Sequence, residues 1–200
     1  MLKSYYRLNQ LEAGCDEAGR GCLAGPVFAA AVILPANYSN EMIMDSKKIS
    51  EKQRTKVKEI IEKDAIAFSV AKIDVEEIDT INILQASVKA MNLAVNKLKI
   101  KPDFLLIDGN YFHTSSKIPF VCIKKGDATY LSIAAASVLA KVYRDDYMLA
   151  LQKKYPIYQW HKNKGYPTKQ HRESIIYHGV TKHHRKSFHL HSKQLNLYLE

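Results

Sequence analysis

Short apolar runs separated by polar segments occupy the first two thirds of the chain. Most are too short for a typical helix and are bounded by glycine, proline or acidic residues, which favours buried strands. The first two runs are joined by a glycine-rich connection that ends at Gly25-Pro26. The predicted strands are residues 11–15, 27–34, 65–73, 104–107 and 119–123.

Three longer segments carry apolar residues at the three- to four-residue spacing of helices. Ser50 followed by Gln53 forms a capping box that opens the first helix, which we expect to end at Lys63. Residues 81–98 predict a second helix. The small-residue run after Leu131 predicts a third, packed closely on a flat surface and reaching Tyr155. Helices alternating with strands indicate an α/β fold, a mixed central sheet flanked by helices.

Length and composition are those of one compact domain. The chain has 200 residues, 46% of them hydrophobic, which is enough to bury one core. The one boundary that the pattern suggests is residues 156–167. We therefore expect residues 1–155 to form the main domain and residues 156–200 a basic helical extension packed on it.

No segment has the features of a membrane anchor or a secretion signal. No apolar run approaches the roughly 20 residues that span a bilayer, and the first ten residues lack the apolar core of a signal peptide. Cys15, Cys22 and Cys122 are odd in number and lack CxxC spacing, which favours reduced thiols over disulfides or a zinc cluster. We expect a soluble, cytoplasmic protein with no membrane partner.

The positive charge is concentrated in the last quarter of the chain. Of the formal net charge of +10, +8 lies in residues 151–200, where ten Lys and Arg face only Glu173 and Glu200. Aromatic residues such as Tyr155 and Trp160 interleave with the basic ones, a composition that suits a nucleic-acid backbone. On charge alone, a solvated pair of basic helices explains the pattern equally well. The histidines at 183, 184, 189 and 191 lack accompanying acids or cysteines, so we expect partly titrating imidazoles there and no metal site.

Acidic residues stand at the ends of three predicted strands. Asp16 and Glu17 follow the first strand, Asp108 the fourth and Asp127 the fifth. Strands that stop at a common edge would bring these carboxylates together, and such a cluster persists only if cations neutralise it. Two Mg²⁺ ions could then activate a water for phosphodiester hydrolysis. Asp108-Gly109 alone would be an ordinary turn, but adjacent acids leaving a core strand gain nothing structurally.

Four motifs, in this order along the chain, resemble those of ribonuclease HII. The resemblance extends from Cys15 to Phe188 and is specific in combination, whereas the first motif alone would be only suggestive. Cys15 departs from the branched aliphatic residue expected at its position. The motifs are Asp16-Glu17-Ala18-Gly19-Arg20-Gly21 with Leu23-Ala24-Gly25-Pro26-Val27, Asp45-Ser46-Lys47-Lys48-Ile49-Ser50, Lys125-Gly126-Asp127 with residues 132–145, and Lys164-Gly165-Tyr166-Pro167-Thr168-Lys169-Gln170-His171.

The resemblance implies an RNase H-like fold and a site of four carboxylates. Asp16, Glu17, Asp108 and Asp127 would be both catalytic residues and ligands of two Mn²⁺ or Mg²⁺ ions. The implied activity is that of an endonuclease that cuts the RNA strand of RNA/DNA hybrids, and cuts 5′ of ribonucleotides embedded in duplex DNA. The products would carry a 3′-hydroxyl and a 5′-phosphate, and a monomer is expected.

The resemblance also assigns substrate-binding residues. Gly19, Arg20 and Gly21 would read the ribose 2′-hydroxyl through main-chain groups, which glycines allow to approach a sugar closely. Tyr166 would pack on the deoxyribose that follows the ribonucleotide. Lys47 and Ser137 would contact phosphates. Read in isolation, Lys47 would belong to a solvated face, Ser137 to a helix packing face and Tyr166 to a surface anchor.

Three alternatives stay open. Ribonuclease HIII shares the core signature but carries an N-terminal substrate-binding domain, for which the 15 residues before Asp16 leave no room. A non-catalytic duplex nucleic-acid-binding protein of the same fold would not need all four acids. A nuclease or transposase of this fold acting only on DNA would have no use for a 2′-hydroxyl reader.

Overall fold

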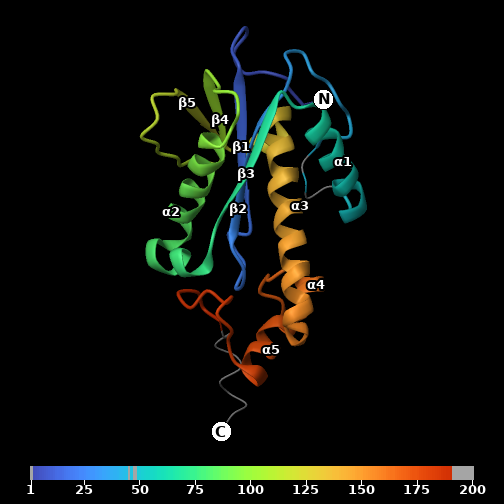
Figure 1. The fold of residues 1–200 in the computed structure, drawn as a ribbon, viewed down its shortest axis with the longest axis vertical. Coiled ribbons are helices and arrows are strands. Elements are labelled where there is room, and N and C mark those ends of the chain that lie inside the picture. Colours follow the sequence, from blue (N-terminus) through green and yellow to red (C-terminus); the bar gives the residue numbers. More distant parts are fainter. Residues whose placement is uncertain (1, 45, 47–48, 191–200) are drawn as a thin grey trace.

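A mixed five-stranded sheet forms the centre of the molecule in the computed structural model, which describes residues 2–44, 46 and 49–190 (Figure 1). Its strand order is β3-β2-β1-β4-β5. β1 and β3 run antiparallel to β2, and β4 pairs parallel with β1 and β5. All five predicted strands are confirmed. Their bounds are β1 (Glu12–Ala18), β2 (Val27–Ile33), β3 (Ala67–Ile73), β4 (Phe104–Asp108) and β5 (Phe120–Ile123).

β1 continues further than the sequence indicated. Its parallel pairing with β4 ends at Cys15 opposite Ile107, but its antiparallel pairing with β2 continues to Ala18 opposite Phe28. Asp16 and Glu17 therefore lie inside the strand, although we expected them after it. The prediction was wrong because it took the end of the apolar run as the end of the strand, whereas the main-chain ladder with β2 tolerates the two acids.

Helices cover both faces of the sheet, with α2 on one face and α1 and α3 on the other (Figure 1). A buried apolar cluster lies between each face and its helices, so the central strands are covered on both sides. The helices are α1 (Glu51–Asp64), α2 (Val75–Asn96), α3 (Leu131–Lys154), α4 (Trp160–Asn163) and α5 (Lys169–His178), with the 3₁₀ turns η1 (Gly126–Ala128) and η2 (Pro156–Tyr158).

The helix starts show where local signals were read correctly and where one was missed. The capping box of α1 is present: Gln53 N–H donates to the Ser50 side chain, and the Gln53 side chain accepts from Ser50 N–H. α2 begins at Val75, six residues before the predicted start at Ile81. Inside α2 the chain kinks at Asn82, whose φ is 64° and whose Oδ1 accepts hydrogen bonds from the next turn. The predicted helix corresponds to the piece after this kink.

The small-residue run of α3 packs closely on the sheet, as expected. A Cβ added at Gly14 of β1 would lie 2.2 Å from the main-chain carbon of Ser132 and 2.4 Å from the nitrogen of Ile133. Ala134, Ala135 and Ala136 are fully buried at the same level of the helix. The lack of side-chain bulk on both elements therefore allows helix and strand to approach.

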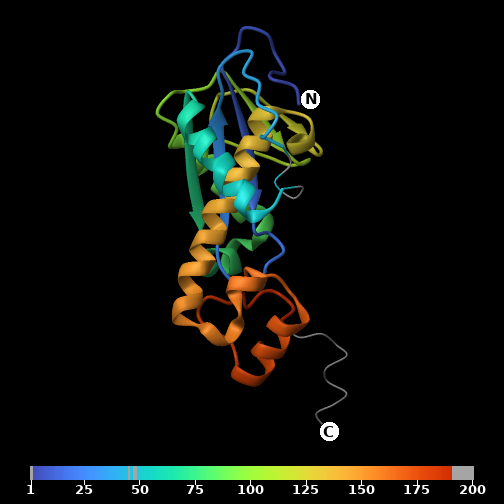
Figure 2. The ribbon, with the colours of Figure 1, turned by 90° about the vertical axis from the view of Figure 1, so that its right-hand side faces the viewer.

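Residues 156–190 lie beyond the end of the sheet, around the lower end of the long helix α3 in Figure 2. They share a buried cluster with the last turns of α3 and with the connection after β1, centred on Trp160, Tyr158 and Met148. This part contains less helix than predicted, because only α4 and α5 are helical and residues 179–190 follow an irregular path. Within the described residues, no helix is long and apolar enough to cross a membrane.

Candidate active site

The parallel strands β1 and β4 bring acids from distant parts of the sequence to one edge of the sheet. Cys15 pairs with Ile107, so Asp16 and Asp108 are the next residues along adjacent strands. The turn η1 after β5 contains Asp127, and its Gly126 N–H donates a hydrogen bond of 2.7 Å to Asp108 Oδ1. All four expected acids therefore belong to neighbouring segments, and the structure places them at the expected edge.

The acids lie in an environment that disfavours their negative charges. Burial raises the pKa of Asp16 well above its ordinary value, and repulsion from Glu17 and Asp108 raises it further. Burial also raises the pKa of Glu17, while its ion pair with Arg20 opposes this rise. Asp127 is 4% exposed. Buried carboxylates that repel one another form a site that a cation would stabilise.

Local donors hold three of the carboxylates where they are. Asp16 Oδ1 accepts Glu17 N–H at 2.6 Å, Glu17 Oε1 accepts Arg20 Nη1 at 3.1 Å, and Asp108 accepts Gly126 N–H. Among the described residues, no three His, Cys, Asp or Glu side chains already lie where they could share one ion. The donor set fits Mg²⁺ or Mn²⁺, because hard, negatively charged carboxylate oxygens suit these ions.

The connection after β1 has the tight geometry that its glycines predict. Gly19 has a φ of 96°, and a Cβ there would lie 2.0 Å from Arg144 Nε, so glycine is required by conformation and by contact. A Cβ at Gly21 would meet nothing within 4 Å, which leaves that main chain open to an approaching group. The Arg20 side chain is half exposed while it pairs with Glu17.

Tyr166 lies close to this connection. Its ring centroid is 5.5 Å from Lys141 Nζ and 5.8 Å from Arg144 Cζ, and its hydroxyl forms a hydrogen bond with the Cys22 side chain. The residue is 38% exposed, so part of the ring faces solvent. The structure therefore brings the predicted tyrosine and the predicted glycine-rich connection to the same place.

The two predicted phosphate contacts have different outcomes. Ser137 is buried in α3, where its hydroxyl hydrogen-bonds Ser46 at 3.0 Å and the Asp16 side chain. In this position it orients Asp16, and its contact with a phosphate stays a prediction. Lys47 lies outside the described residues, as do Asp45 and Lys48 of the same motif.

Sequence reasoning missed the buried basic and imidazole groups near Tyr166. Arg144 and Arg185 are both fully buried, although Arg185 belongs to the basic stretch of residues 151–200 that suits a nucleic-acid backbone. His184 is 1% exposed, and burial lowers its pKa to about 4, so the expectation of a partly titrating imidazole is wrong for this residue. Burial also lowers the pKa of His171, which takes Trp160 Nε1–H on Nε2 and donates from Nδ1 to the Tyr166 carbonyl.

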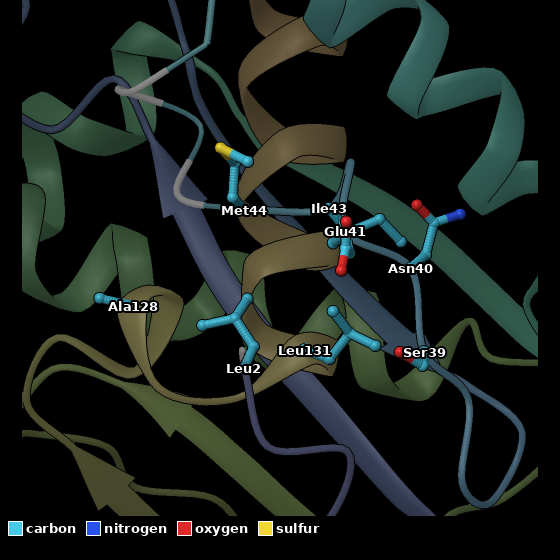
Figure 3. A pocket seen from close by; sticks show the side chains of 8 residues that line it. All are labelled: Leu2, Ser39, Asn40, Glu41, Ile43, Met44, Ala128 and Leu131. Atoms are coloured by element: carbon cyan, nitrogen blue, oxygen red, sulfur yellow. The ribbon is translucent and has the colours of Figure 1, made fainter.

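A cavity of about 500 Å³ lies next to the acidic edge, beside η1 (Figure 3). Leu2, Ile43, Met44 and Leu131 provide an apolar lining, and Glu41 is the one charged residue among the described residues that line it. None of the four predicted acids lines it. The cavity is therefore a neighbour of the candidate active site and not the site itself.

Sheet order, helical layers and the acids at one edge together define a protein with an RNase H-like fold. Solved structures with the same backbone arrangement support this class. Ribonuclease H2 from Pyrococcus horikoshii OT3 superposes with a TM-score of 0.76 at 24% identity, covering 90% of this chain and 94% of that chain. Bst-RNase HIII in complex with Mn²⁺ superposes with a TM-score of 0.72 at 16% identity, covering 94% of this chain and 70% of that chain.

Sequence comparison narrows the class to one family. The family model for ribonuclease HII matches residues 13–192. Ribonuclease HII from Parabacteroides distasonis is 58% identical over 98% of this chain and 99% of that protein, and that from Bacteroides thetaiotaomicron is 57% identical over the same shares. The chain therefore belongs to the ribonuclease HII family. It is a ribonuclease H, and so a hydrolase.

Proposed function

We propose that this enzyme cuts duplex DNA on the 5′ side of an embedded ribonucleotide, and also cuts the RNA strand of RNA/DNA hybrids, leaving 3′-hydroxyl and 5′-phosphate ends. The observation that carries the proposal is the placement of Asp16 and Asp108 on adjacent parallel strands beside a glycine-rich connection and Tyr166. Chemistry and sugar recognition can therefore act on one strand of the substrate.

The four acids would hold two divalent cations. Asp16, Glu17, Asp108 and Asp127 supply the carboxylate oxygens, and the burial that raises the pKa of Asp16 and of Glu17 explains why a cation would stabilise their charged forms. When bound, Mg²⁺ or Mn²⁺ supplies an activated water and stabilises the oxygen that leaves the phosphate. Ser137 orients Asp16 through the hydrogen bond between their side chains.

Recognition of the ribonucleotide would come from the main chain of residues 19–21. Gly21 leaves open space in which a sugar can lie, and the positive φ of Gly19 gives the connection a tight turn directly after the strand that carries Asp16 and Glu17. A 2′-hydroxyl can both donate and accept a hydrogen bond, so main-chain groups suffice to distinguish ribose from deoxyribose. Tyr166 would pack on the next sugar, where deoxyribose fits better than ribose.

Exposed lysines of the C-terminal part would hold the phosphate backbone. Lys162 and Lys169 are exposed on either side of Tyr166 in the sequence, while Lys164 is buried. We also propose that the enzyme acts as a monomer in the cytoplasm, with residues 156–200 as an extension of the catalytic domain. The cytoplasmic location is supported by Cys15, Cys22 and Cys122, which are all free thiols.

A non-catalytic duplex-binding protein of the same fold is the alternative that a cleavage assay tests. The substrates are a DNA duplex with one ribonucleotide and an otherwise identical all-DNA duplex, each incubated with Mg²⁺, with Mn²⁺ and with a chelator. We expect metal-dependent cleavage of the ribonucleotide-containing duplex alone. Cleavage of both duplexes would indicate a DNA nuclease, and binding without cleavage would favour the alternative.

A further inference from the structure

A buried guanidinium contacts both of the segments to which substrate recognition is assigned. Arg144 of α3 is 0% exposed. Its Nε donates to the Pro26 carbonyl at 3.1 Å and its Nη2 to the Ala24 carbonyl at 3.0 Å. Its Nη1 donates to a different segment, at the Lys164 carbonyl, at 2.9 Å. This side chain therefore adds a second link between the connection after β1 and the segment that carries Tyr166, beside the main-chain hydrogen bond of 2.8 Å from Leu23 N–H to the Gly165 carbonyl.

Arg144 also touches the residues that would face the two sugars. A Cβ at Gly19 would overlap its guanidinium, with Nε at 2.0 Å and Cδ at 2.5 Å. On the other side its Cζ lies 5.8 Å from the centroid of the Tyr166 ring. The guanidinium is thus placed between the expected ribose reader and the expected deoxyribose contact.

The partners of Arg144 explain why its geometry is fixed. All three of its hydrogen bonds go to main-chain carbonyls, and each nitrogen serves a different carbonyl. A planar guanidinium presents its donors in a rigid fork, whereas a lysine ammonium is a single point on a flexible stem. Displacement of this plane would remove three of the hydrogen bonds that set the position of residues 24–26 relative to Lys164.

We propose that Arg144 is a specificity-determining positioning residue. Together with the Leu23–Gly165 main-chain hydrogen bond it holds residues 19–26 and Tyr166 at a set spacing, and its planar fork tunes the preference for a ribonucleotide followed by a deoxyribonucleotide. Two protein contacts with successive sugars must be separated by the distance between those sugars. A small misplacement of either contact lowers the rate strongly. The inference rests on the proposed function, because it assumes that these segments face the two sugars.

The test measures kcat/KM on two substrates, a DNA duplex with one ribonucleotide and a long RNA/DNA hybrid. Arg144→Lys keeps the charge but cannot serve three carbonyls in one plane. We expect it to lower the ratio of single-ribonucleotide to hybrid cleavage by about tenfold, since the hybrid offers ribose on both sides and depends less on the spacing. Arg144→Gln, which keeps two donors without the charge, serves as the second variant if the first does not fold.

A double-mutant cycle with Tyr166→Ala identifies the path of the effect. If Arg144 acts through the position of Tyr166, Arg144→Lys will not lower the ratio further in the Tyr166→Ala background. A structural role alone would instead lower cleavage of both substrates in proportion. Additive changes of the ratio, or equal losses on both substrates, would overturn the proposal.

Arg172→Lys is the matched control. Arg172 Nη1 also donates to two main-chain carbonyls, those of His189 and Leu190, both at 2.9 Å, but its hydrogen bonds do not reach the connection after β1 or Tyr166. We expect this variant to keep the wild-type substrate ratio. A fall of the ratio in Arg172→Lys as large as in Arg144→Lys would overturn the assignment. Equal cleavage of all-DNA and ribonucleotide-containing duplexes by the wild type would defeat the proposed function instead.

Discussion

Among the acids of the candidate active site, Asp16 combines burial with repulsion from two neighbouring carboxylates. It is 5% exposed, its pKa is raised by burial and by Glu17 and Asp108, and Ser137 hydrogen-bonds its carboxylate. Asp16→Asn keeps the size of the side chain while removing charge and a ligand for cations. We expect cleavage to fall by roughly a thousandfold or more at saturating Mg²⁺. Urea unfolding without metal should show a free energy of unfolding no lower than that of the wild type, because repulsion is relieved.

The matched control for this prediction is Asp146→Asn, which changes an exposed carboxylate on α3 that pairs with Lys58. Cleavage by that variant should stay close to the wild-type value. Near-normal turnover in Asp16→Asn would show that the acids at the sheet edge are not the catalytic site.

At this scale the sequence revealed the acids but not the arginines. A pair of carboxylates at the end of an apolar run has few structural explanations, so Asp16 and Glu17 could be found from the pattern. A basic residue in a basic region has many structural explanations. Nothing in the local sequence distinguishes the buried Arg185 from the exposed Lys186. Arg185 is identified only by its distant partners, the carbonyls of Gly25 and Arg20.

Among the secondary-structure elements, α2 shows how local and tertiary signals compete. Its Asn82 has a φ of 64°, and its Oδ1 caps the second piece by accepting from Leu84 N–H and Gln85 N–H. Asn82→Ala removes this cap and places a less tolerant residue at positive φ. We expect the free energy of unfolding, measured in urea, to fall by about 1–2 kcal/mol.

Asn82→Gly separates the two contributions. Glycine tolerates positive φ and is itself an acceptable N-cap. The free energy of unfolding of Asn82→Gly should therefore fall by only a few tenths of a kcal/mol. Equal losses in both variants would mean that conformation at Asn82 does not limit the stability of α2.

The strands were predictable because buried apolar runs have few alternatives, and the ends of elements were not, because pairing partners set them. β1 reaches Ala18 because β2 continues beside it, which no local feature of residues 16–18 reveals. The first piece of α2 was missed because Glu76 and Glu77 interrupt the apolar pattern. The irregular path of residues 179–190 is held by contacts such as those of His184 with Thr181 and His171.

At the scale of the whole molecule, the buried imidazoles make stability depend on pH. Burial lowers the pKa of His184 to about 4, so between its ordinary value of 6.5 and about 4 the unfolded chain binds a proton that the folded protein does not. Stability is therefore complete above that ordinary value and declines as the pH falls. The pKa of His171 is lowered in the same direction.

We expect His184 to lower the free energy of unfolding by about 1–2 kcal/mol between about pH 7.5 and pH 5. The raised pKa values of Asp16 and Glu17 act in the opposite direction, so the measurement compares urea unfolding of the wild type with that of His184→Gln. The difference in the free energy of unfolding between the wild type and His184→Gln should become smaller as the pH falls. A difference independent of pH would contradict a buried neutral imidazole.

The exposed lysines of the C-terminal part should determine how binding responds to salt. In the double variant Lys162→Gln and Lys169→Gln, each lost phosphate contact should reduce the slope of log affinity against log salt by about 0.9. Lys52→Gln and Lys56→Gln, on the exposed face of α1, form the control pair. An unchanged slope in the first pair would show that α4 and α5 lie away from the nucleic acid.

The central claim, that the acids act beside a connection which reads ribose and a tyrosine which contacts the next sugar, is tested most directly by mapping the cut. The substrate is a DNA duplex with one ribonucleotide, labelled in turn at each end of that strand, incubated with Mg²⁺. Because the proposed nucleophile is an activated water and not the 2′-hydroxyl, we predict one cut 5′ of the ribonucleotide, a 3′-hydroxyl upstream and a 5′-phosphate on the ribonucleotide. A cut on its 3′ side, or a 2′,3′-cyclic phosphate end, would contradict the account.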